Sequence, residues 1–370
     1  MSIPVSIPDL RGNEAAYLQK CVEDNWVSSA GPFLAEFEQK IAALSGARHA
    51  ISTCNGTSAI YLALRALGVG RQDVVLVPDW TFSATVNAVL LVGAVPHFVD
   101  IHDLDWGLSP ERLRHLFETQ PASYLERIKA IVPVHALGHP ADMDPIVEVA
   151  RSFGVFVVED AAGALGSEYA GRHAGTIGDA GIFSFNGNKL VTTGGGGIVV
   201  TNDDEIAERV RLLSSQGRTG ERYQHADIAF NFRMTNLNAA VGLAQLERFD
   251  EMLGRRQAIS RRYRKELKDI PNLSVSPQNP RAVSNEWMSA VRCSSVGFAE
   301  GLVEKLQEAG IGAGIFWESL SQQDAYAAFR KTGLSCSQSL SGTVVSLPCS
   351  SNLTDDCQTH VIDSIRKAMS

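Results

Sequence analysis

Uninterrupted apolar runs recur through the first two thirds of the chain, and helical spacing follows most of them. Strands that are apolar at every position are buried on both faces, as in parallel sheets that helices cover on both sides. The alternation of such runs with helical segments therefore predicts an α/β fold with a mostly parallel sheet. The expected strands lie within residues 47–53, 73–78, 128–136, 155–160, 180–185 and 197–202.

The sequence changes in character after residue 250. A long, charged amphipathic helix begins near residue 251, and a loop starting at Pro271 follows it. Shorter apolar and helical segments then continue to the end of the chain. This mixture predicts a second, smaller α+β domain. We therefore expect a large domain over residues 1–250 and a small domain over residues 251–370.

Composition restricts the classes of partner. The 370 residues carry a net charge of −8 and no block of Lys and Arg, which disfavours binding to nucleic-acid backbones. Six scattered cysteines without a C-x-x-C pair fit reduced thiols better than a disulfide framework or a zinc site. The N-terminus lacks the features of a signal peptide, and no apolar run is long enough to span a bilayer. We expect a cytoplasmic protein that binds neither nucleic acid nor membrane.

One pair of histidines has the spacing of metal ligands. His135 and His139 would lie on one face of a helix, and Asp142 is nearby. However, Gly138 and Pro140 disfavour a helix at this place. We interpret the segment as a strand end and a turn, and we expect no metal site.

Polar residues follow two of the predicted strands at the edge where parallel sheets bind ligands. Gly56 and Thr57 open a helix after residues 47–53, so their free N–H groups form either a phosphate site or a plain helix cap. Asp160 ends residues 155–160. A carboxylate there either pairs with a cation, such as a protonated ring nitrogen, or caps the next segment. Neither pattern alone distinguishes a ligand site from a helix cap.

Lys189 lies between a strand and four consecutive glycines. A loop lysine usually faces water, but the glycines at 194–197 leave room for a planar ligand against the backbone. A lysine in such a pocket can lose its proton and attack a carbonyl carbon. A phosphate site, a carboxylate for a ring nitrogen and a nucleophilic lysine are what a pyridoxal phosphate enzyme requires. Their coincidence predicts this cofactor, with Lys189 and Asp160 as catalytic residues.

The same stretches resemble a known family. NGTSAIYLAL, EDAAGALGS and SFNGNKLVTTGGGGIVVTND are similar to the DegT/DnrJ/EryC1/StrS sugar aminotransferases, within fold type I of the pyridoxal phosphate enzymes. The resemblance implies a mostly parallel seven-stranded sheet sandwiched by helices, and a smaller C-terminal α+β domain. SFNGNK followed by NFRMTNLNAA is similar to the branch that aminates C4 of UDP-linked 4-keto-6-deoxy-N-acetylhexosamines, on the routes to bacillosamine and legionaminic acid. L-glutamate is the implied amino donor.

The resemblance also implies roles for single residues. Lys189 matches the Schiff-base lysine, and Asp160 matches the acid that pairs with the pyridinium nitrogen. Gly56 and Thr57 match the phosphate-binding turn, and Ser184 matches a further phosphate contact.

Two more roles concern the cofactor ring and a second subunit. Phe82 matches the aromatic residue that stacks on the ring, although Trp80 on the same loop is a rival, and a core position is the plain alternative. Asn231 matches a phosphate contact from the neighbouring subunit, which implies a homodimer with shared active sites.

Two departures from the family leave the substrate open. Gly163 stands where the family often has Gln or Glu, and Gly314 stands where the related branch usually has Arg. The alternatives are the same chemistry on GDP-4-keto-6-deoxymannose or a dTDP-linked keto-sugar, or a non-catalytic sensor with the same fold. The lysine at position 189 argues against related dehydratases, which carry histidine there.

Overall fold

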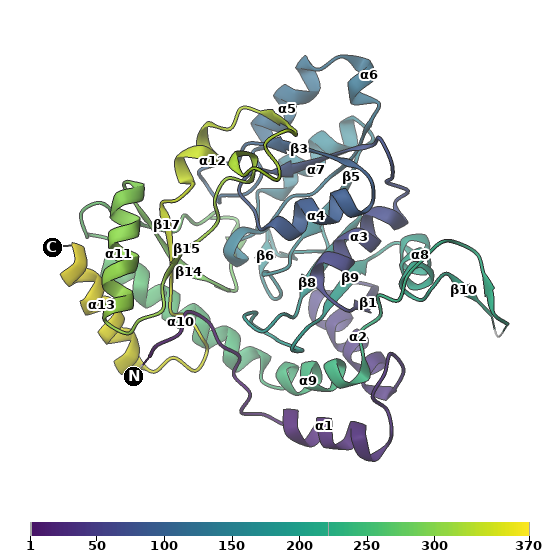
Figure 1. The fold of residues 1–370 in the computed structure, drawn as a ribbon, viewed down its shortest axis with the longest axis horizontal. Coiled ribbons are helices and arrows are strands. Elements are labelled where there is room, and N and C mark those ends of the chain that lie inside the picture. Colours follow the sequence, from purple (N-terminus) through teal and green to yellow (C-terminus); the bar gives the residue numbers. More distant parts are fainter. Residues whose placement is uncertain (1, 221, 370) are drawn as a thin grey trace.

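A mostly parallel sheet forms the centre of the larger part of the molecule (Figure 1). The structure is a computed structural model that describes residues 2–220 and 222–369. Only β9 runs antiparallel to its two neighbours, and the other pairings within this sheet are parallel. In spatial order the strands are β1 (His49–Thr53), β9 (Gly197–Thr201), β8 (Ala180–Ser184), β5 (Phe156–Asp160), β4 (Ile128–Ile131), β2 (Val74–Pro78), β3 (Val95–Val99) and β16 (Arg330–Thr332).

The expected α/β fold is confirmed, with one more strand than the seven expected. The additional strand is β16, which pairs with the sheet edge at β3. Its sequence, Arg-Lys-Thr, has no apolar run, because it lies at an edge and two of its three residues are exposed. No periodicity in the sequence marks such a strand, so only the tertiary pairing reveals it.

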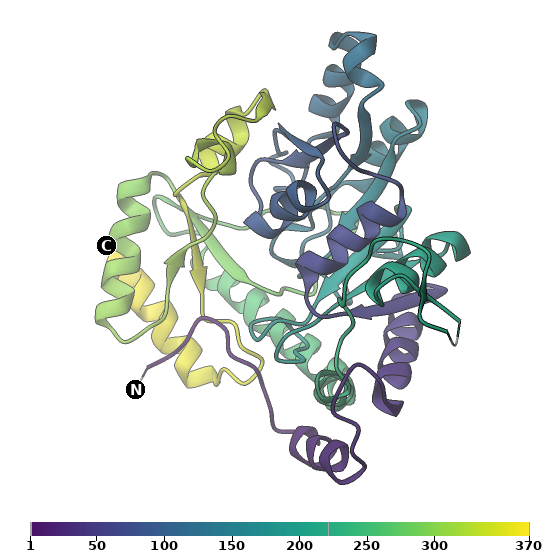
Figure 2. The ribbon, with the colours of Figure 1, turned by 45° about the vertical axis from the view of Figure 1, so that its right-hand side comes forward.

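Helices cover both faces of the sheet (Figure 2). Alternate residues of β2 show the division, since Val75 and Val77 face one layer while Val74 and Leu76 face the other. One layer contains α3 (Gly56–Ala66), α4 (Ser83–Leu91) and α8 (Asp204–Ser214). The opposite layer contains α2 (Pro32–Ser45), α5 (Pro110–Thr119), α7 (Met143–Ser152) and α9 (Asn236–Leu246).

A second, antiparallel sheet with its own core lies beside the first. In Figure 1 this part is on the left, and both chain ends lie near it. Its strands are β12 (Leu273–Val275), β14 (Ser289–Cys293), β17 (Val344–Leu347) and β15 (Gly314–Ile315). The helices that cover it are α10 (Phe249–Leu267), α11 (Val296–Glu308) and α13 (Asp355–Met369).

Short elements complete the described chain. A three-stranded sheet joins the two parts and consists of β13 (Ala282–Val283), β6 (Glu168–Tyr169) and β7 (Arg172–His173). The strands β10 (Arg218–Thr219) and β11 (Gln224–His225) form a hairpin that extends from the body at the right of Figure 1. The remaining helices are α1 (Glu14–Glu23), α6 (Ala122–Leu125) and α12 (Ser335–Leu340), and 3-10 turns occur at Ala136–Gly138 and Leu320–Gln322.

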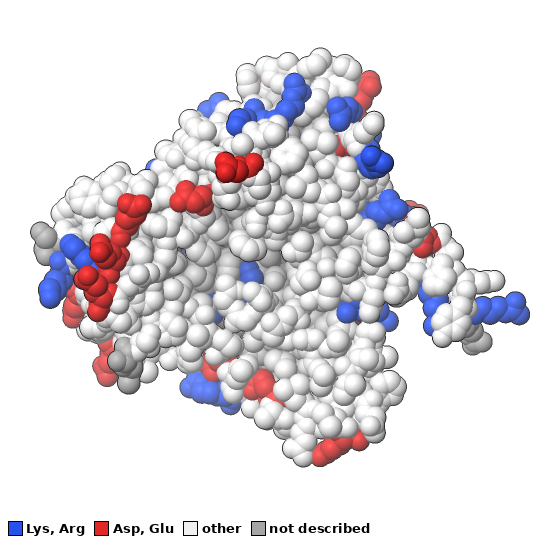
Figure 3. Space-filling view, in the orientation of Figure 1, with Lys and Arg blue, Asp and Glu red and all other residues white. Residues whose placement is uncertain are grey.

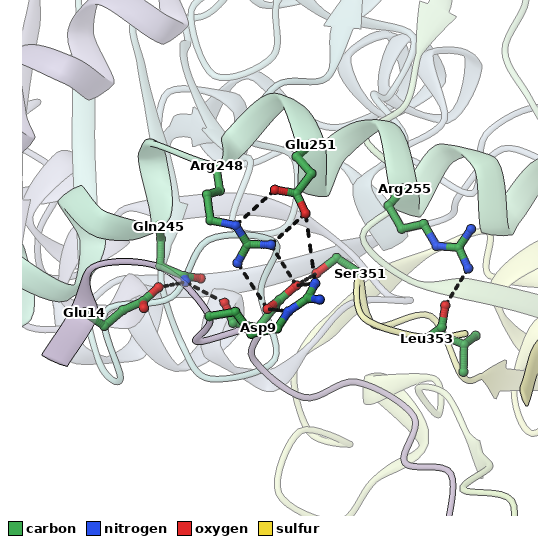
Figure 4. Close-up of polar contacts among 9 residues, drawn as sticks. Asp9, Glu14, Gln245, Arg248, Glu251, Arg255, Ser351 and Leu353 are labelled. Atoms are coloured by element: carbon green, nitrogen blue, oxygen red, sulfur yellow. Dashed lines mark hydrogen bonds and ion pairs between the residues drawn. The ribbon is translucent and has the colours of Figure 1, made fainter. Parts of the chain in front are cut away.

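The N-terminal segment ties the two parts together. Its first residues pack on the second core, where Ile3 forms an isolated bridge with Ile311. Farther along, the buried carboxylate of Asp9 accepts hydrogen bonds from Arg11 and Arg248 (Figure 4). The hydrogen bond from Arg11 holds the pKa of the Asp9 carboxyl well below its usual range. The division at residues 250/251 stays a prediction, and it falls in the first turn of α10.

Three properties of residues 2–220 and 222–369 bear on the remaining expectations. No helix in these ranges is long and apolar enough to cross a membrane. No group of three or more His, Cys, Asp and Glu side chains there is arranged to hold a metal ion. The six cysteines are all free thiols.

Candidate active site

A cavity of about 290 Å³ lies at the carboxyl ends of the parallel strands. Figure 3 shows a hollow near the middle of this face, with Lys or Arg atoms at its floor. Strands β5 and β8 are neighbours in the sheet, so the residues at their carboxyl ends meet at one edge. The structure thereby brings six of the seven predicted site residues to the cavity wall: Gly56, Thr57, Phe82, Asp160, Ser184 and Lys189.

The amine of Lys189 points into this cavity from the turn after β8. The turn is closed by a 3.0 Å hydrogen bond from the Lys189 N–H to the Asn186 carbonyl. Burial lowers the pKa of the amine to about 7, although the Asp160 carboxylate favours the charged form, and Arg256 adds to the lowering. This shift favours the uncharged amine, the form that a nucleophile or a base requires.

Two hydrogen bonds orient the carboxylate of Asp160. The Thr85 hydroxyl of α4 donates to Oδ2 at 2.7 Å, and the Ala162 N–H donates to Oδ1 at 3.1 Å. Thr81 lies 3.0 Å from the Thr85 hydroxyl and holds it in turn. The contact between α4 and β5 was missed from the sequence, because no local motif links threonines at 81 and 85 to an acid at 160.

The neighbouring carboxylate, Glu159, has a different function. Successive strand residues face opposite sides, so Glu159 points away from the cavity when Asp160 points into it. Glu159 is fully buried and lies 2.9 Å from the His135 ring, and it accepts backbone N–H groups of Gly175 and Ile177 at 2.8 and 2.6 Å. Both Glu159 and His135 thus have structural partners, which fits the expected strand end and turn at His135.

The first turn of α3 is capped as the plain interpretation predicted, and it leaves room for the phosphate site as well. The Asn55 side chain caps the helix by accepting the Ser58 N–H at 2.8 Å. The N–H groups of Gly56 and Thr57 precede the first intrahelical donor and remain available to an anion. A Cβ on Gly56 would approach the Ser184 Cβ to 3.0 Å. Glycine therefore allows the end of β8 to lie against the start of α3, which brings the Ser184 hydroxyl into the site.

The glycines after Lys189 serve different purposes. Gly197 belongs to β9, and a Cβ there would lie 2.5 Å from the Asn55 carbonyl group. A Cβ on Gly196 would lie 2.3 Å from the Thr193 hydroxyl. Gly195 lines the cavity, and a Cβ there would meet no atom within 4 Å. The open space expected from this run is thus found at Gly195, while the two later glycines permit close packing.

The two aromatic candidates for stacking on the cofactor ring differ in their exposure. Phe82, at the N-cap of α4, is 60% exposed and lines the cavity. Trp80 is fully buried against Trp106 and Trp317, and its indole N–H donates to the Trp317 carbonyl at 3.1 Å. The stacking position is therefore open to Phe82 and closed to Trp80.

Asn231 lies outside the cavity lining of this chain. It is exposed and forms a backbone bridge to Ser215. The segment that carries it passes beside the start of α3, where the Cys54 N–H donates to the Phe232 carbonyl at 2.7 Å. Its contact with a cofactor, which was expected across a subunit interface, stays a prediction.

Several cavity residues come from the C-terminal part of the chain and were missed from the sequence. Trp287, Phe316 and Trp317 form an aromatic side of the cavity. They carry no local pattern that distinguishes them from core aromatics. Trp287 also accounts for Gly163, because a Cβ on Gly163 would lie 2.2 Å from the indole ring. Gly314 lies in β15 and is not part of the cavity lining.

A family model covers nearly the whole chain. The model of the DegT/DnrJ/EryC1/StrS aminotransferase family matches residues 8–366. The chain belongs to this family. It is accordingly a pyridoxal phosphate-dependent nucleotide-sugar aminotransferase, as the resemblance of its motifs implied.

Individual relatives refine this assignment. A GDP-perosamine synthase of Caulobacter vibrioides is 38% identical over 376 residues, which cover 99% of this chain and 98% of the relative. A GDP-perosamine synthase of Escherichia coli O157:H7 is 39% identical over 290 residues, covering 78% and 77%. The crystal structure of DesI with its TDP-sugar product superimposes with a TM-score of 0.90 at 29% identity, covering 100% of this chain and 93% of DesI. The expected family is confirmed, whereas these names do not support the UDP-specific branch.

Proposed function

We propose that this aminotransferase moves an amino group from L-glutamate to C4 of a GDP-linked 4-keto-6-deoxyhexose. The names of the relatives above favour GDP over the UDP-linked acceptor that the motifs suggested. The observation that carries the chemistry is the convergence of Lys189, Asp160 and the first turn of α3 on one cavity. A TDP-linked sugar is the second candidate, because DesI has the same fold and a TDP-sugar product.

The residues of the cavity fit pyridoxal phosphate. The free N–H groups of α3 and the hydroxyls of Thr57 and Ser184 suit a phosphate dianion. Phe82 offers an exposed ring at the cavity wall. Asn188 lines the cavity, and its side-chain oxygen is buried without a hydrogen-bond partner among the described residues. Such an acceptor is expected to find its partner in a ligand.

The roles of the protein groups follow from their chemistry. Bound in the cavity, pyridoxal phosphate supplies a carbonyl carbon that accepts amines and a ring that takes up electrons. The partly uncharged amine of Lys189 can bond to that carbon and, when free, can take the proton from the donor's α-carbon. The Asp160 anion, oriented by Thr85, favours a protonated ring nitrogen. Lys189→Arg would therefore abolish transamination while keeping the positive charge.

We also infer that a second copy of the chain completes the site. The segment around Asn231 contains large apolar side chains without cover: Tyr223 is 84%, Ile228 80% and Phe230 48% exposed. Exposed apolar groups gathered on one segment indicate an interface. A homodimer would bury them and carry Asn231 to the phosphate end of the partner's cavity, as the family resemblance implies.

Absorbance spectra test this function directly. Purified protein is mixed with pyridoxal phosphate and then with excess L-glutamate. The expected result is a lysine-bound band that L-glutamate converts to the pyridoxamine form. GDP-, UDP- and dTDP-linked 4-keto-6-deoxy sugars are then compared for the rate at which they convert the pyridoxamine form back. The GDP-linked sugar is expected to react fastest. A spectrum that L-glutamate does not alter would refute the enzyme and favour the sensor, while a faster UDP- or dTDP-sugar would refute only the acceptor.

A further inference from the structure

The indole of Trp287 is the surface on which the Lys189 amine rests. The nitrogen Nζ lies 3.4 Å from the centroid of the Trp287 ring. The indole N–H donates to the carbonyl of Asn188, the residue before the lysine, at 2.9 Å. Trp287 therefore contacts both ends of Lys189: its edge holds the backbone of the turn and its face holds the amine.

The backbone around Trp287 is constrained from several directions. Its N–H donates to Asn285 Oδ1 at 2.9 Å, and the Asn285 amide donates to the carbonyls of Gly163 and Leu165 at 2.8 and 2.9 Å. The preceding residue, Glu286, has a left-handed backbone (φ 56°). A non-glycine residue keeps that conformation only where its surroundings enforce it.

Buried polar groups supply that enforcement at Glu286. The Glu286 carboxylate accepts a hydrogen bond from Ser260 at 2.8 Å and pairs with Arg264. The Trp287 carbonyl accepts a hydrogen bond from the buried Arg256. Protein groups alone thus hold the indole in place, which is how an active-site group is preorganised.

Gly163 is the residue that admits the indole. A Cβ at this position would lie 2.2 Å from the Trp287 Cε3 atom and 2.8 Å from Cδ2. Both are atoms of a ring that cannot bend away, and Trp287 is only 5% exposed. A side chain at position 163 and the observed position of Trp287 therefore exclude each other.

The charges around the amine show why an aromatic surface suits this place. Asp160 and His135 line the cavity together with Lys189, and the charges of Asp160 and Arg256 act on its amine. An indole face attracts an ammonium group but forms no hydrogen bond that would hold the uncharged amine. It therefore holds the amine in its charged form without trapping it once the proton is lost.

We propose that Trp287 is a positioning residue for Lys189, with its indole face as the resting place of the amine whenever that amine is not bonded to the cofactor, and that Gly163 makes room for the indole. The proposal rests on the aminotransferase activity of the family and is independent of the acceptor sugar.

Fluorine NMR of the full chain without cofactor tests the contact itself. All five tryptophans are replaced by 5-fluorotryptophan, and the Trp287 resonance is assigned as the one missing from Trp287→Phe. We expect this resonance to titrate with pH near the pKa of Lys189, and to stop titrating in Lys189→Met. Addition of pyridoxal phosphate should abolish the titration in the same way. A resonance that is independent of pH, or that titrates unchanged in Lys189→Met, would overturn the proposal.

Half-reaction kinetics test the positioning. Trp287→Leu should slow cofactor attachment and the L-glutamate half-reaction on the order of 10-fold in rate constant, with little change in the L-glutamate concentration at half-saturation. Trp287→Phe retains an aromatic face and should recover most of the rate. Trp106→Phe alters a buried tryptophan outside the cavity and should leave cofactor attachment unchanged. Equal losses in Trp287→Phe and Trp287→Leu would contradict the role of the aromatic face.

A double-mutant cycle tests the part played by Gly163. Gly163→Ala should displace the indole, shift the Trp287 fluorine resonance and slow cofactor attachment. In a Trp287→Leu background the same substitution should slow cofactor attachment much less, because the indole ring that conflicts with the added methyl group is absent. If Gly163→Ala alone does not fold, the double variant should fold, because it lacks the indole. Failure of both variants to fold would show that glycine is needed at position 163 for a reason other than Trp287. Cofactor attachment does not involve the sugar, so these results are separable from the choice of acceptor.

Discussion

The chemistry at the scale of the residue depends on a lysine whose environment reduces its charge. Burial and the nearby Arg256 disfavour the ammonium form of Lys189, while Asp160 favours it. The disfavouring influences prevail and bring the pKa to about 7. An amine of this kind is ready to react at neutral pH, whereas an exposed lysine would be almost entirely charged.

The pH dependence of cofactor attachment follows from this pKa. The folded-state pKa is below the usual lysine value, so the uncharged amine dominates above about pH 7 and is lost below it. The rate of attachment should fall about tenfold per pH unit below this point and level off above it. Stopped-flow absorbance measures the rate, with Lys189→Arg as the control that shows no attachment. A rate that keeps rising to about pH 10 would indicate an ordinary lysine.

The hydrogen bond from Thr85 to Asp160 offers a second test. Thr85→Val keeps the shape of the side chain and removes the donor, so the buried carboxylate loses one of its two partners. A hydrogen bond to a charged group contributes about 1.5–3 kcal/mol, which predicts a loss of roughly tenfold or more in the rate of the L-glutamate half-reaction. Thr85→Ser should retain most of the rate. Equal rates for the Val and Ser variants would remove Thr85 from this role.

At the scale of the element, the segment after β15 joins the main sheet through two buried acids. Asp79, just after β2, accepts hydrogen bonds from Ser319, the Ser321 N–H and Ser337. Asp100, just after β3, accepts the N–H group of Ser337 at 2.8 Å. These contacts fix the loop that places Phe316 and Trp317 at the cavity, and they allow β16 to pair with β3.

Removal of Asp79 should therefore destabilise the protein and open this side of the cavity. Asp79→Ala removes a buried acceptor that three donors share, which is expected to cost about 3 kcal/mol in the free energy of unfolding. Urea denaturation measures this cost, and Asp324→Ala, an exposed change in the same segment, is the matched control. Equal midpoints for the two variants would show that the segment is held by other contacts.

At the scale of the whole molecule, the cavity draws on both parts of the chain and, by our proposal, on a second chain. The β10–β11 hairpin extends from the body of the molecule (Figure 1), and the exposed residues after it are not part of the lining of their own cavity. The cavity itself is closed by Trp287 and Phe316 from beyond residue 250. A ligand in this site would therefore bridge elements that are distant in the sequence.

Mixed dimers test whether each active site contains residues of both chains. Lys189→Ala and Asn231→Ala should each have low activity as homodimers. When the two variants are unfolded and refolded together, hybrid dimers should form. In a hybrid, one site carries both substitutions, and the other site has an intact Lys189 from one chain and an intact Asn231 from the other. Regained activity toward one quarter of wild type is expected for random mixing with independent sites. Mixtures that stay at the level of the separate variants would show that each site is built from one chain.

The α/β class, the cofactor and the candidate residues at the strand ends could be predicted from the amino-acid sequence. Buried parallel strands are apolar along their whole length, and the residues after each strand meet at one edge. Lys189, Asp160 and Gly56 could therefore be predicted from local patterns, and Ser184 from the family resemblance.

The groups that support these residues are evident only in the folded chain. Thr85 reaches Asp160, and Trp287 reaches Lys189 and Gly163, across about 75 to 125 residues of chain. Their side chains carry no periodicity, since a single contact between distant segments leaves no mark on the neighbouring residues. The same holds for β16, whose short polar sequence becomes a strand only because the edge of β3 is there to pair with it.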